Sequence, residues 1–458
     1  MGVPNHKKIQ HLYLRAGFGL PPLEWNEKRE MPISLAVEAL FSDINKVGEL
    51  QQMDLSYFSL SPSEQNKKRS EYQGKSGKVL RQRNLDWINQ MATGSSNPLV
   101  EKMTLFWHGH FANHIRFGFT AVQQINMLKR HALGNFKDLV LGICRDPGML
   151  HYLNASNNQK NNVNENFGRE LLELFTMGIG NYTQQDVVEA SRAFTGWNHN
   201  EHFRFVKQDR FHDTGKKTFL GRTGNFDGSD IVDIILEEKA TARFITRKIY
   251  AYFVNQDVNE ARVRTLADSF YNSGYDIKAL MKSILSSSWF YDEENIGIKI
   301  KSPTELLVGI MKTFRLKLHE PEKFYQLQKA LGQKLFEPPN VSGWPSGKLW
   351  INNGNIMLRM GLANFLTQQL QVSVPFRKLH PVNISKTLPV QKISGMSFIG
   401  FNEIFGCCSP GDLVNGIAEY LLQPTTHQNI GYNPGFSEQE KMFHIILQIM
   451  RLPEYQVC

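Results

Sequence analysis

Three histidines and three large aromatic residues occupy six of the nine positions in the stretch FWHGHFANH, residues 106–114. Imidazole nitrogens bind divalent metals and transfer protons near neutral pH, so this stretch is a candidate functional site. On a helix, His108 and His110 lie about 200° apart and cannot share one ion. His110 and His114 lie on one helix face, at a spacing that suits two ligands. The alternative is that these histidines are buried and bonded to backbone carbonyls.

A second candidate stretch, NENFGRELLELFTMGIG (164–180), places an acid beside an apolar helix stripe. Glu170 lies on the flank of the stripe that begins at Phe167. A carboxylate at the edge of an apolar face must be paired, metal-bound or protonated, so Glu170 is a candidate catalytic acid and metal ligand. Arg169, which can pair with acids one turn away, is grouped with it as a candidate catalytic residue. A structural ion pair is the alternative.

A third candidate stretch, FHDTGKKTFLG (211–221), carries an adjacent His212 and Asp213 in a glycine-rich loop. Loops hold functional residues more often than helix faces do. A His–Asp pair can bind a divalent metal or act as an acid/base pair. Both residues are therefore candidate catalytic residues and candidate metal ligands.

The elements that must position these residues are mostly helices. Apolar residues recur at helical spacing through most of the chain, and Thr183 and Ser302 are expected helix N-caps. Alternation and glycine turns in residues 198–226 predict a small β-hairpin or an ordered loop. Three prolines, two glycines and two tryptophans in residues 337–350 predict a rigid loop.

The expected fold is therefore mainly α-helical. We expect a large helical domain, residues 1–372, that carries the small β-hairpin or ordered-loop insertion. A connector and C-terminal helices, residues 373–458, are expected to pack on it.

Composition places the chain among folded globular proteins. It has 458 residues, 41% of them hydrophobic and 21% charged. Without a run of eighteen apolar residues, no membrane span is expected. The N-terminal residues lack the apolar core of a signal peptide, so a cytoplasmic location is expected. The four cysteines form no CxxC pair, which argues against a cysteine zinc site and against a disulfide framework.

The formal net charge is +9, and residues 66–83 form its densest basic stretch. Such a stretch can bind phosphate or nucleic acid. No nucleic-acid motif accompanies it, so we interpret it as a solvated loop and helix face. We expect no nucleic-acid partner.

Several long motifs resemble a bacterial family of obscure function, the one catalogued as domain of unknown function 1800. They include IQHLYLRAGFG, MTLFWHGHFA and LGQKLFEPPNVSGWPSGKLW, and with the second and third candidate stretches they lie in order over about residues 9–352. The resemblance implies that the family motif contains Trp107, His108, His110, Phe111, Asn164, Asn166, Arg169, Glu170, Glu173, Trp197, His212, Asp213, Gly221, Pro338, Pro339, Gly343 and Trp344. His114 is outside that motif, which weakens the His110–His114 pair.

The resemblance also implies a gene neighbour, because members of this family often lie beside a gene for an exported, sulfatase-like protein of unknown function. Many of its members carry export signals. The resemblance supplies no established activity.

Two classes of function remain open, and we favour an enzyme because the His–Asp loop and several histidines exceed what a fold requires. If the enzyme is metal-dependent, we expect one of His108 and His110 to lie with Glu170, His212 and Asp213 in one pocket. Such ligands suit zinc, iron or manganese, and the simplest chemistry is hydrolysis by a metal-activated water. We expect His110 to face the helical core and His108 to face the pocket.

In a metal-free form, Glu170 and Asp213 act as a carboxylate pair on a sugar. The candidate substrate-binding residues for the enzyme are Trp107, Trp197, Trp344 and Trp350. The other class is a non-catalytic partner or assembly protein that acts with the co-encoded exported protein. In that case the same polar residues tie irregular loops to the helical core.

Overall fold

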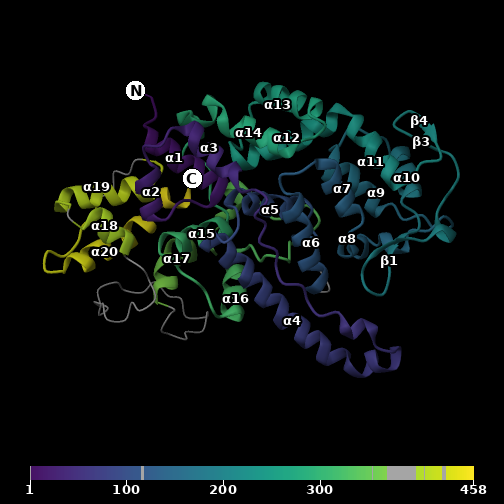
Figure 1. Ribbon diagram of the computed structural model, residues 1–458, viewed down its shortest axis with the longest axis horizontal. Helices are drawn as coiled ribbons and strands as arrows, with labels where there is room; N and C mark the ends of the chain where they lie inside the picture. The colour runs from purple at the N-terminus through teal and green to yellow at the C-terminus, as the bar shows by residue number, and fades with distance from the viewer. Residues whose placement is uncertain (1, 115–117, 353, 369–398, 407, 425–429) are drawn as a thin grey trace.

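The computed structural model describes residues 2–114, 118–352, 354–368, 399–406, 408–424 and 430–458. Over these residues the chain is mainly α-helical, with two short antiparallel hairpins (Figure 1). The predicted fold class is confirmed. No helix in the described ranges has the length and apolar character needed to cross a membrane.

The helices before the first hairpin are α1 (Asn5–Gly17), α2 (Pro22–Lys28), α3 (Ile33–Ser42), α4 (Pro62–Thr93), α5 (Pro98–His110), α6 (Gly118–His131), α7 (Phe136–Cys144), α8 (Pro147–Tyr152), α9 (Asn166–Glu170) and α10 (Gln184–Ala193). Those after the second hairpin are α11 (Gly228–Glu237), α12 (Lys239–Phe253), α13 (Glu260–Asn272), α14 (Ile277–Ser286), α15 (Pro303–Thr313), α16 (Pro321–Leu331), α17 (Ile356–Gln368), α18 (Ile399–Phe405), α19 (Pro410–Leu421) and α20 (Glu438–Met450).

Local sequence signals explain several helix starts. Thr183 caps α10 in a reciprocal capping box with Asp186. Ser302 caps α15 in the same way with Glu305, and Pro303 occupies the first helical position. Side-chain oxygens at these positions satisfy backbone N–H groups that have no partner inside the helix.

Helix α5 lies at the centre of the fold. Its residues from Leu99 to His108 are all buried, and it packs against α1, α3 and α6. A helix that is buried on every side needs apolar or satisfied polar residues all round. Because α5 ends at His110, His114 lies beyond the helix and the expected i, i+4 histidine pair does not form.

The β structure is confined to two hairpins in the predicted region. Strand β1 (Trp197–His199) pairs with β2 (Phe205–Lys207), and β3 (Lys217–Phe219) pairs with β4 (Arg222–Gly224). Each strand has three residues, so neither hairpin is stable alone, and both rest on helices. Strand β3 packs on α10.

The proline-rich stretch 337–350 is mostly irregular, with one short helical turn at its end, Gly347–Trp350. It packs directly on α5. At Gly343 the backbone has φ +85°, and a Cβ there would collide with the carbonyl of Gly109. Glycine is required at this position both for the left-handed backbone and for the close approach to α5.

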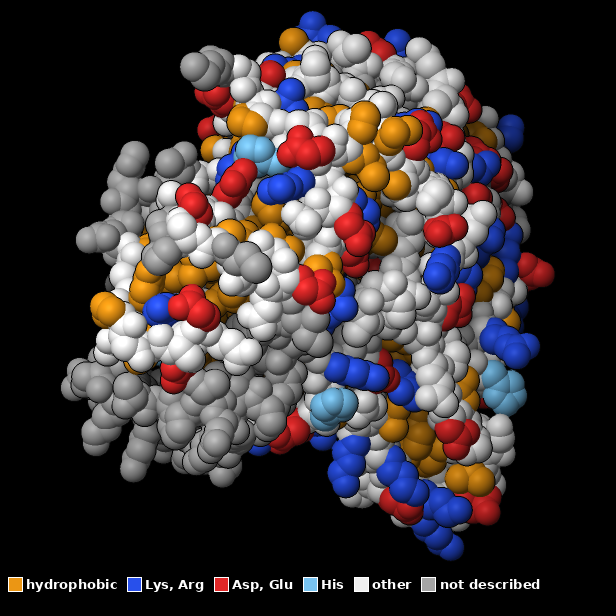
Figure 2. Space-filling model, turned by 60° about the vertical axis from the view of Figure 1, so that its left-hand side comes forward, with side chains coloured by type: hydrophobic (Ala, Val, Ile, Leu, Met, Phe, Trp, Pro, Cys, Tyr) orange, Lys and Arg blue, Asp and Glu red, His pale blue; other side chains and the backbone are white. Residues whose placement is uncertain are grey.

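The N-terminal half of α4 projects from the rest of the molecule and carries the basic stretch (Figure 1). Lys67, Lys68 and Arg69 are exposed there. Figure 2 shows Lys and Arg side chains gathered at this lower projection. Acidic residues on the same helix partly neutralise this basic stretch, as in the pair between Lys75 and Glu71.

Helices α18, α19 and α20 lie beside the N-terminal helices (Figure 1). Helix α18 packs on α2, and the Tyr420 hydroxyl donates to the Leu20 carbonyl at 2.9 Å. The predicted connector lies largely outside the described residues, which resume at 399 after 368.

Candidate functional site

His108 faces the loops that follow α16 and not a polar cleft. Its Nε2 accepts the backbone N–H of Phe336 at 3.0 Å, and its ring contacts Trp87 and Trp344. The side chain is fully buried. Burial lowers the pKa of His108 to about 3, so the imidazole is neutral at neutral pH. The expectation that His108 faces a polar pocket is therefore wrong.

His110 points to the other side of α5, as the helical offset predicts. Its Nε2 lies 3.0 Å from the Phe175 carbonyl, and its Nδ1 lies 3.4 Å from the ammonium of Lys248. A neutral ring that donates from Nε2 and accepts at Nδ1 satisfies both contacts. Burial, assisted by the Lys248 charge, holds the pKa of His110 well below its usual value.

A π-helical turn, Leu171–Thr176, follows α9 and explains this arrangement. Wider turns of this kind leave backbone carbonyls without their usual helical partners. The carbonyl of Leu174 accepts from Lys248 at 3.1 Å, and that of Phe175 meets His110. Burial lowers the pKa of Lys248 to about 8.

Glu170 lies half-buried at the end of α9. Burial raises its pKa, and the neighbouring Glu173 carboxylate adds to the effect. Its charge in turn helps to raise the pKa of Tyr152, after burial of that hydroxyl. A carboxyl group with a raised pKa keeps its proton to a higher pH than a free carboxyl group does. Arg169 pairs with Glu165 at 2.9 Å and donates to Gln184, and its charge partly opposes the rise in the pKa of Glu170.

The His212–Asp213 pair fastens the segment between β2 and β3 to the end of α10. His212 is buried, and its Nδ1 lies 2.8 Å from the Thr195 carbonyl. Asp213 pairs with Arg192 at 2.8 Å and accepts the Gly215 N–H. Partial burial by itself raises the pKa of Asp213, but these bonds outweigh it and hold the pKa below its usual value.

The four candidate tryptophans do not form a sugar-stacking surface. Trp107, Trp197 and Trp350 are buried, and Trp107 donates to the Ala132 carbonyl at 3.0 Å. Only Trp344 among them is partly exposed. Three of the four therefore serve as core residues.

The side chains predicted to share one pocket make separate backbone contacts. His108, His110 and the His212–Asp213 pair each bond to separate parts of the backbone. Across the described ranges, no group of three or more His, Cys, Asp or Glu side chains is placed to hold a metal ion. Each of these polar side chains bonds to a backbone group instead of to another member of the set, because buried backbone groups also need hydrogen-bond partners.

A different pocket opens beside α8, with a volume of about 310 Å³. Two imidazoles and one phenol contribute to its wall. The lining residues are His114, Thr120, Pro147, Gly148, His151, Tyr152 and Phe203. His114 and His151 are both exposed, and the Nδ1 of His114 lies 3.4 Å from the Pro338 carbonyl. Tyr152 connects this pocket with Glu170, because the Glu170 charge helps to raise the pKa of the Tyr152 hydroxyl.

Buried polar groups lie directly behind the pocket at Gly148. A Cβ there would lie 2.8 Å from the Asn113 amide nitrogen and 3.1 Å from an Asp146 oxygen. Asn113 is fully buried, and within the described structure neither its amide nitrogen nor its oxygen has a hydrogen-bond partner. Such groups are rare in folded proteins and indicate a partner outside the described residues, such as a water molecule.

Asp146 is the buried carboxyl of this set. It caps α8 by accepting the Met149 N–H at 2.8 Å, and Gln124 donates to it at 3.3 Å. Burial raises the pKa of Asp146 to about 7, although these bonds act in the opposite direction. Its protonation therefore changes near neutral pH.

This pocket was not predicted from the sequence, although the stretch DPGMLHY (146–152) indicates a short helix with polar aromatic residues at its end. Asp146 followed by Pro147 predicts a helix start, and an adjacent His151 and Tyr152 end that short helix. No sequence signal shows that His114, beyond the end of α5, reaches the same pocket. That juxtaposition depends on how α6 and α8 pack together.

The fold and the pocket define a mainly α-helical protein with a surface site built from α8 and the end of the α5 segment. The chain matches the family model described as "Protein of unknown function (DUF1800)" over residues 11–457. It belongs to that family, and the resemblance drawn from its motifs is confirmed. No curated protein and no solved structure matches the chain.

Proposed function

We propose that this protein is a hydrolase that binds a small polar substrate in the pocket beside α8. The observation that carries the proposal is the pairing of two exposed imidazoles with buried, incompletely bonded polar groups at one pocket. Imidazole is the side chain that most readily donates and accepts protons near neutral pH. His114 and His151 are the proposed proton-transfer residues.

Asp146 and Asn113 support this role as positioning residues behind Gly148. The amide of Asn113 offers donors and an acceptor that no described residue uses. A polar substrate, or a water molecule bound with it, supplies those bonds. Glu170, beside Tyr152, is the proposed store of a proton, because its pKa is raised. These roles replace the single metal pocket expected from the sequence.

The test compares hydrolysis of p-nitrophenyl esters, phosphates and glycosides by the wild type and three variants. We expect the wild type to hydrolyse one of these three substrate classes. His151→Ala or His114→Ala should lower kcat/KM for that substrate class at least tenfold. His202→Ala is the matched control, because its exposed ring lies outside the pocket and its loss should change nothing. Turnover of no class by the wild type, or equal loss in the control, would overturn the proposal.

A second candidate function, a non-catalytic partner of the co-encoded sulfatase-like protein, is favoured by one separate observation. Leu349, Ile351 and Met357 are 72%, 36% and 63% exposed within a short segment. Exposed apolar side chains that lie close together are typical of interaction surfaces. Leu349→Asp should abolish binding to the purified co-encoded protein, whereas Leu35→Asp, at an equally apolar exposed position on α3, should not. Binding that survives both changes would reject this surface.

A further inference from the structure

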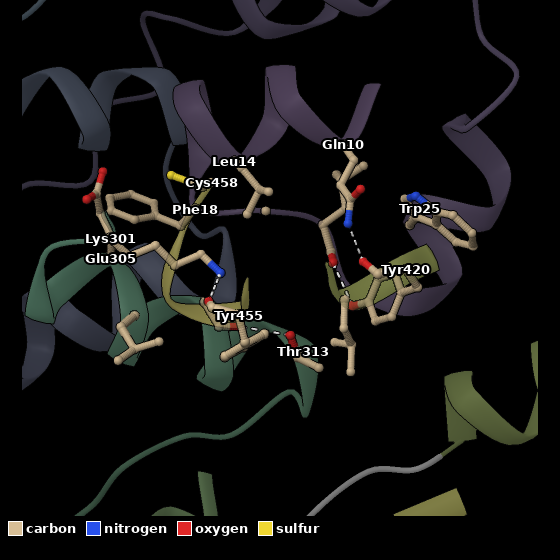
Figure 3. Close-up of a pocket in the computed structure, with 15 residues that line it drawn as sticks. Gln10, Leu14, Phe18, Trp25, Lys301, Glu305, Thr313, Tyr420, Tyr455 and Cys458 are labelled. Carbon is tan, nitrogen blue, oxygen red and sulfur yellow. Dashed lines mark hydrogen bonds between the residues drawn. The ribbon is translucent and has the colours of Figure 1, made fainter. Parts of the chain in front are cut away.

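A second, smaller cavity lies between the N-terminal helices, α15 and the C-terminal residues. Its volume is about 50 Å³, enough for a few water molecules or a small ion. Figure 3 shows Gln10 and Leu14 on one side and Lys301, Thr313 and Tyr455 on the other. The Lys301 ammonium projects into this region and donates to the Tyr455 carbonyl at 2.7 Å (Figure 3).

The charges around this cavity are unbalanced. Glu305 and Cys458 are the acidic groups that act on the cations here. Five cationic side chains face them, all with little or no exposure: Arg15, Lys102, Lys299, Lys301 and Arg359. Glu305 is bonded to Lys102 at 2.5 Å and to Lys299 at 2.6 Å. Its carboxylate is therefore already shared between two ammonium groups.

The remaining cations bond to neutral carbonyls. Arg15 donates to Val254 and Asn295, and Arg359 donates to Lys301, at 2.9, 2.8 and 2.7 Å. Arg359 is 1% exposed, yet its Nε and Nη1 have no partner among the described residues. The Nε of Arg15 is also without one. Buried guanidinium nitrogens of this kind are costly unless an acceptor reaches them.

Burial of the cavity lysine also affects its protonation. Burial lowers the pKa of Lys301 to about 8, although the negative charges at Cys458 and Glu305 act in the opposite direction. An additional anion beside Lys301 would favour its charged form.

We propose that this cavity binds a small oxyanion, either a phosphate or the carboxylate of a small ligand, through the Lys301 ammonium. The charge of Arg359, which acts on Lys301, adds to the positive potential at the bound anion. Thr313 also lines the cavity, and its hydroxyl donates to the Gly309 carbonyl at 2.9 Å. The site is separate from the pocket beside α8 and does not depend on the hydrolase proposal.

The experiment titrates inorganic phosphate, and separately acetate, into the full chain by isothermal titration calorimetry at constant ionic strength, with chloride as the reference salt. We expect one site for at least one of the two probes. Lys301→Met should weaken it at least tenfold, and Lys301→Arg should retain most of the affinity. Which probe binds distinguishes a phosphate site from a carboxylate site. Binding of neither probe overturns the proposal.

Two controls keep the result interpretable. Lys348→Met removes an exposed lysine outside the cavity and should leave binding unchanged. Because Lys301→Met can also impair folding, the melting temperature of the wild type is measured with each probe, where specific binding raises it relative to chloride. Equal weakening in Lys348→Met, or loss of binding in His151→Ala with retention in Lys301→Met, would place the anion elsewhere and overturn the proposal.

Discussion

His108 accepts the backbone N–H of Phe336 through Nε2 at 3.0 Å, and this bond joins the central helix to the loop before the proline-rich stretch. Both residues are buried, and their rings pack beside Trp87. The neighbouring contact of Gly343 on Gly109 holds the same loop to the same helix. His108 is thus part of a structural clamp, by which we mean the contacts that hold this loop to α5. This role accounts for a buried histidine among aromatic residues.

The first prediction removes this acceptor. His108→Leu should lower the free energy of unfolding by about 1–3 kcal/mol, because it leaves the buried Phe336 N–H without a partner. Urea denaturation at pH 7 measures the change. His202→Leu, at an exposed ring, is the control and should stay within about 0.5 kcal/mol of the wild type. Equal stability of His108→Leu and the wild type would refute the clamp.

The second prediction concerns acid pH. The pKa of His108 is about 3 in the folded state, against about 6.5 when exposed. Above pH 6.5 the ring is neutral in both states, so its contribution is fully present. As the pH falls from 6.5 toward 3, the unfolded state gains a proton that the folded state does not. Stability is therefore lost, by about 1.4 kcal/mol per pH unit for each such group.

His11 and His110 act in the same direction, since burial also holds the pKa of each well below its usual value. Urea midpoints at pH 7, 5.5 and 4 should fall steadily. His108→Gln keeps an acceptor for Phe336 but cannot titrate, so its midpoints should fall less steeply. Parallel curves for the two proteins would contradict a neutral, buried His108.

The sequence predicted the helical fold because helical periodicity and capping residues are local signals. Thr183 and Ser302 start helices as expected, and the hairpins fall within residues 198–226 as expected. The separate backbone contacts of the candidate histidines could not be predicted, because that required knowing which polar group meets which backbone group. That information depends on tertiary packing, such as the π-helical turn that offers Phe175 to His110.

A third prediction tests the close packing behind the pocket beside α8. Gly148→Ala places a methyl group 2.8 Å from the Asn113 amide and should lower the free energy of unfolding by about 1–3 kcal/mol. Gly361→Ala is the matched control, because its Cβ would meet no atom within 4 Å in α17. The control should be neutral or slightly stabilising, since alanine favours helix. Thermal unfolding of both variants measures the difference, and a neutral Gly148→Ala would show that the pocket wall yields easily.

A fourth prediction addresses the projecting part of α4. Lys67, Lys68 and Arg69 are exposed, and we expect them not to form a nucleic-acid site. Fluorescence anisotropy with labelled DNA and RNA should show only weak binding at physiological salt, with little change after all three become alanine. Tight binding that weakens steeply with salt and disappears in the triple variant would reject this interpretation.

The last prediction separates a structural from a catalytic Asp213. Its carboxylate bonds Arg192 and the Gly215 N–H, and the pair is partly exposed to solvent. Solvent screens such pairs, so Asp213→Asn should lower the free energy of unfolding by only about 1 kcal/mol. Proteolysis should then cut the loop at residues 214–216 faster, because Arg192 no longer holds it to α10. Hydrolytic turnover, where the wild type shows it, should be unchanged, since the pocket beside α8 does not include Asp213. A large loss of turnover with unchanged stability and unchanged proteolysis would return Asp213 to the catalytic site.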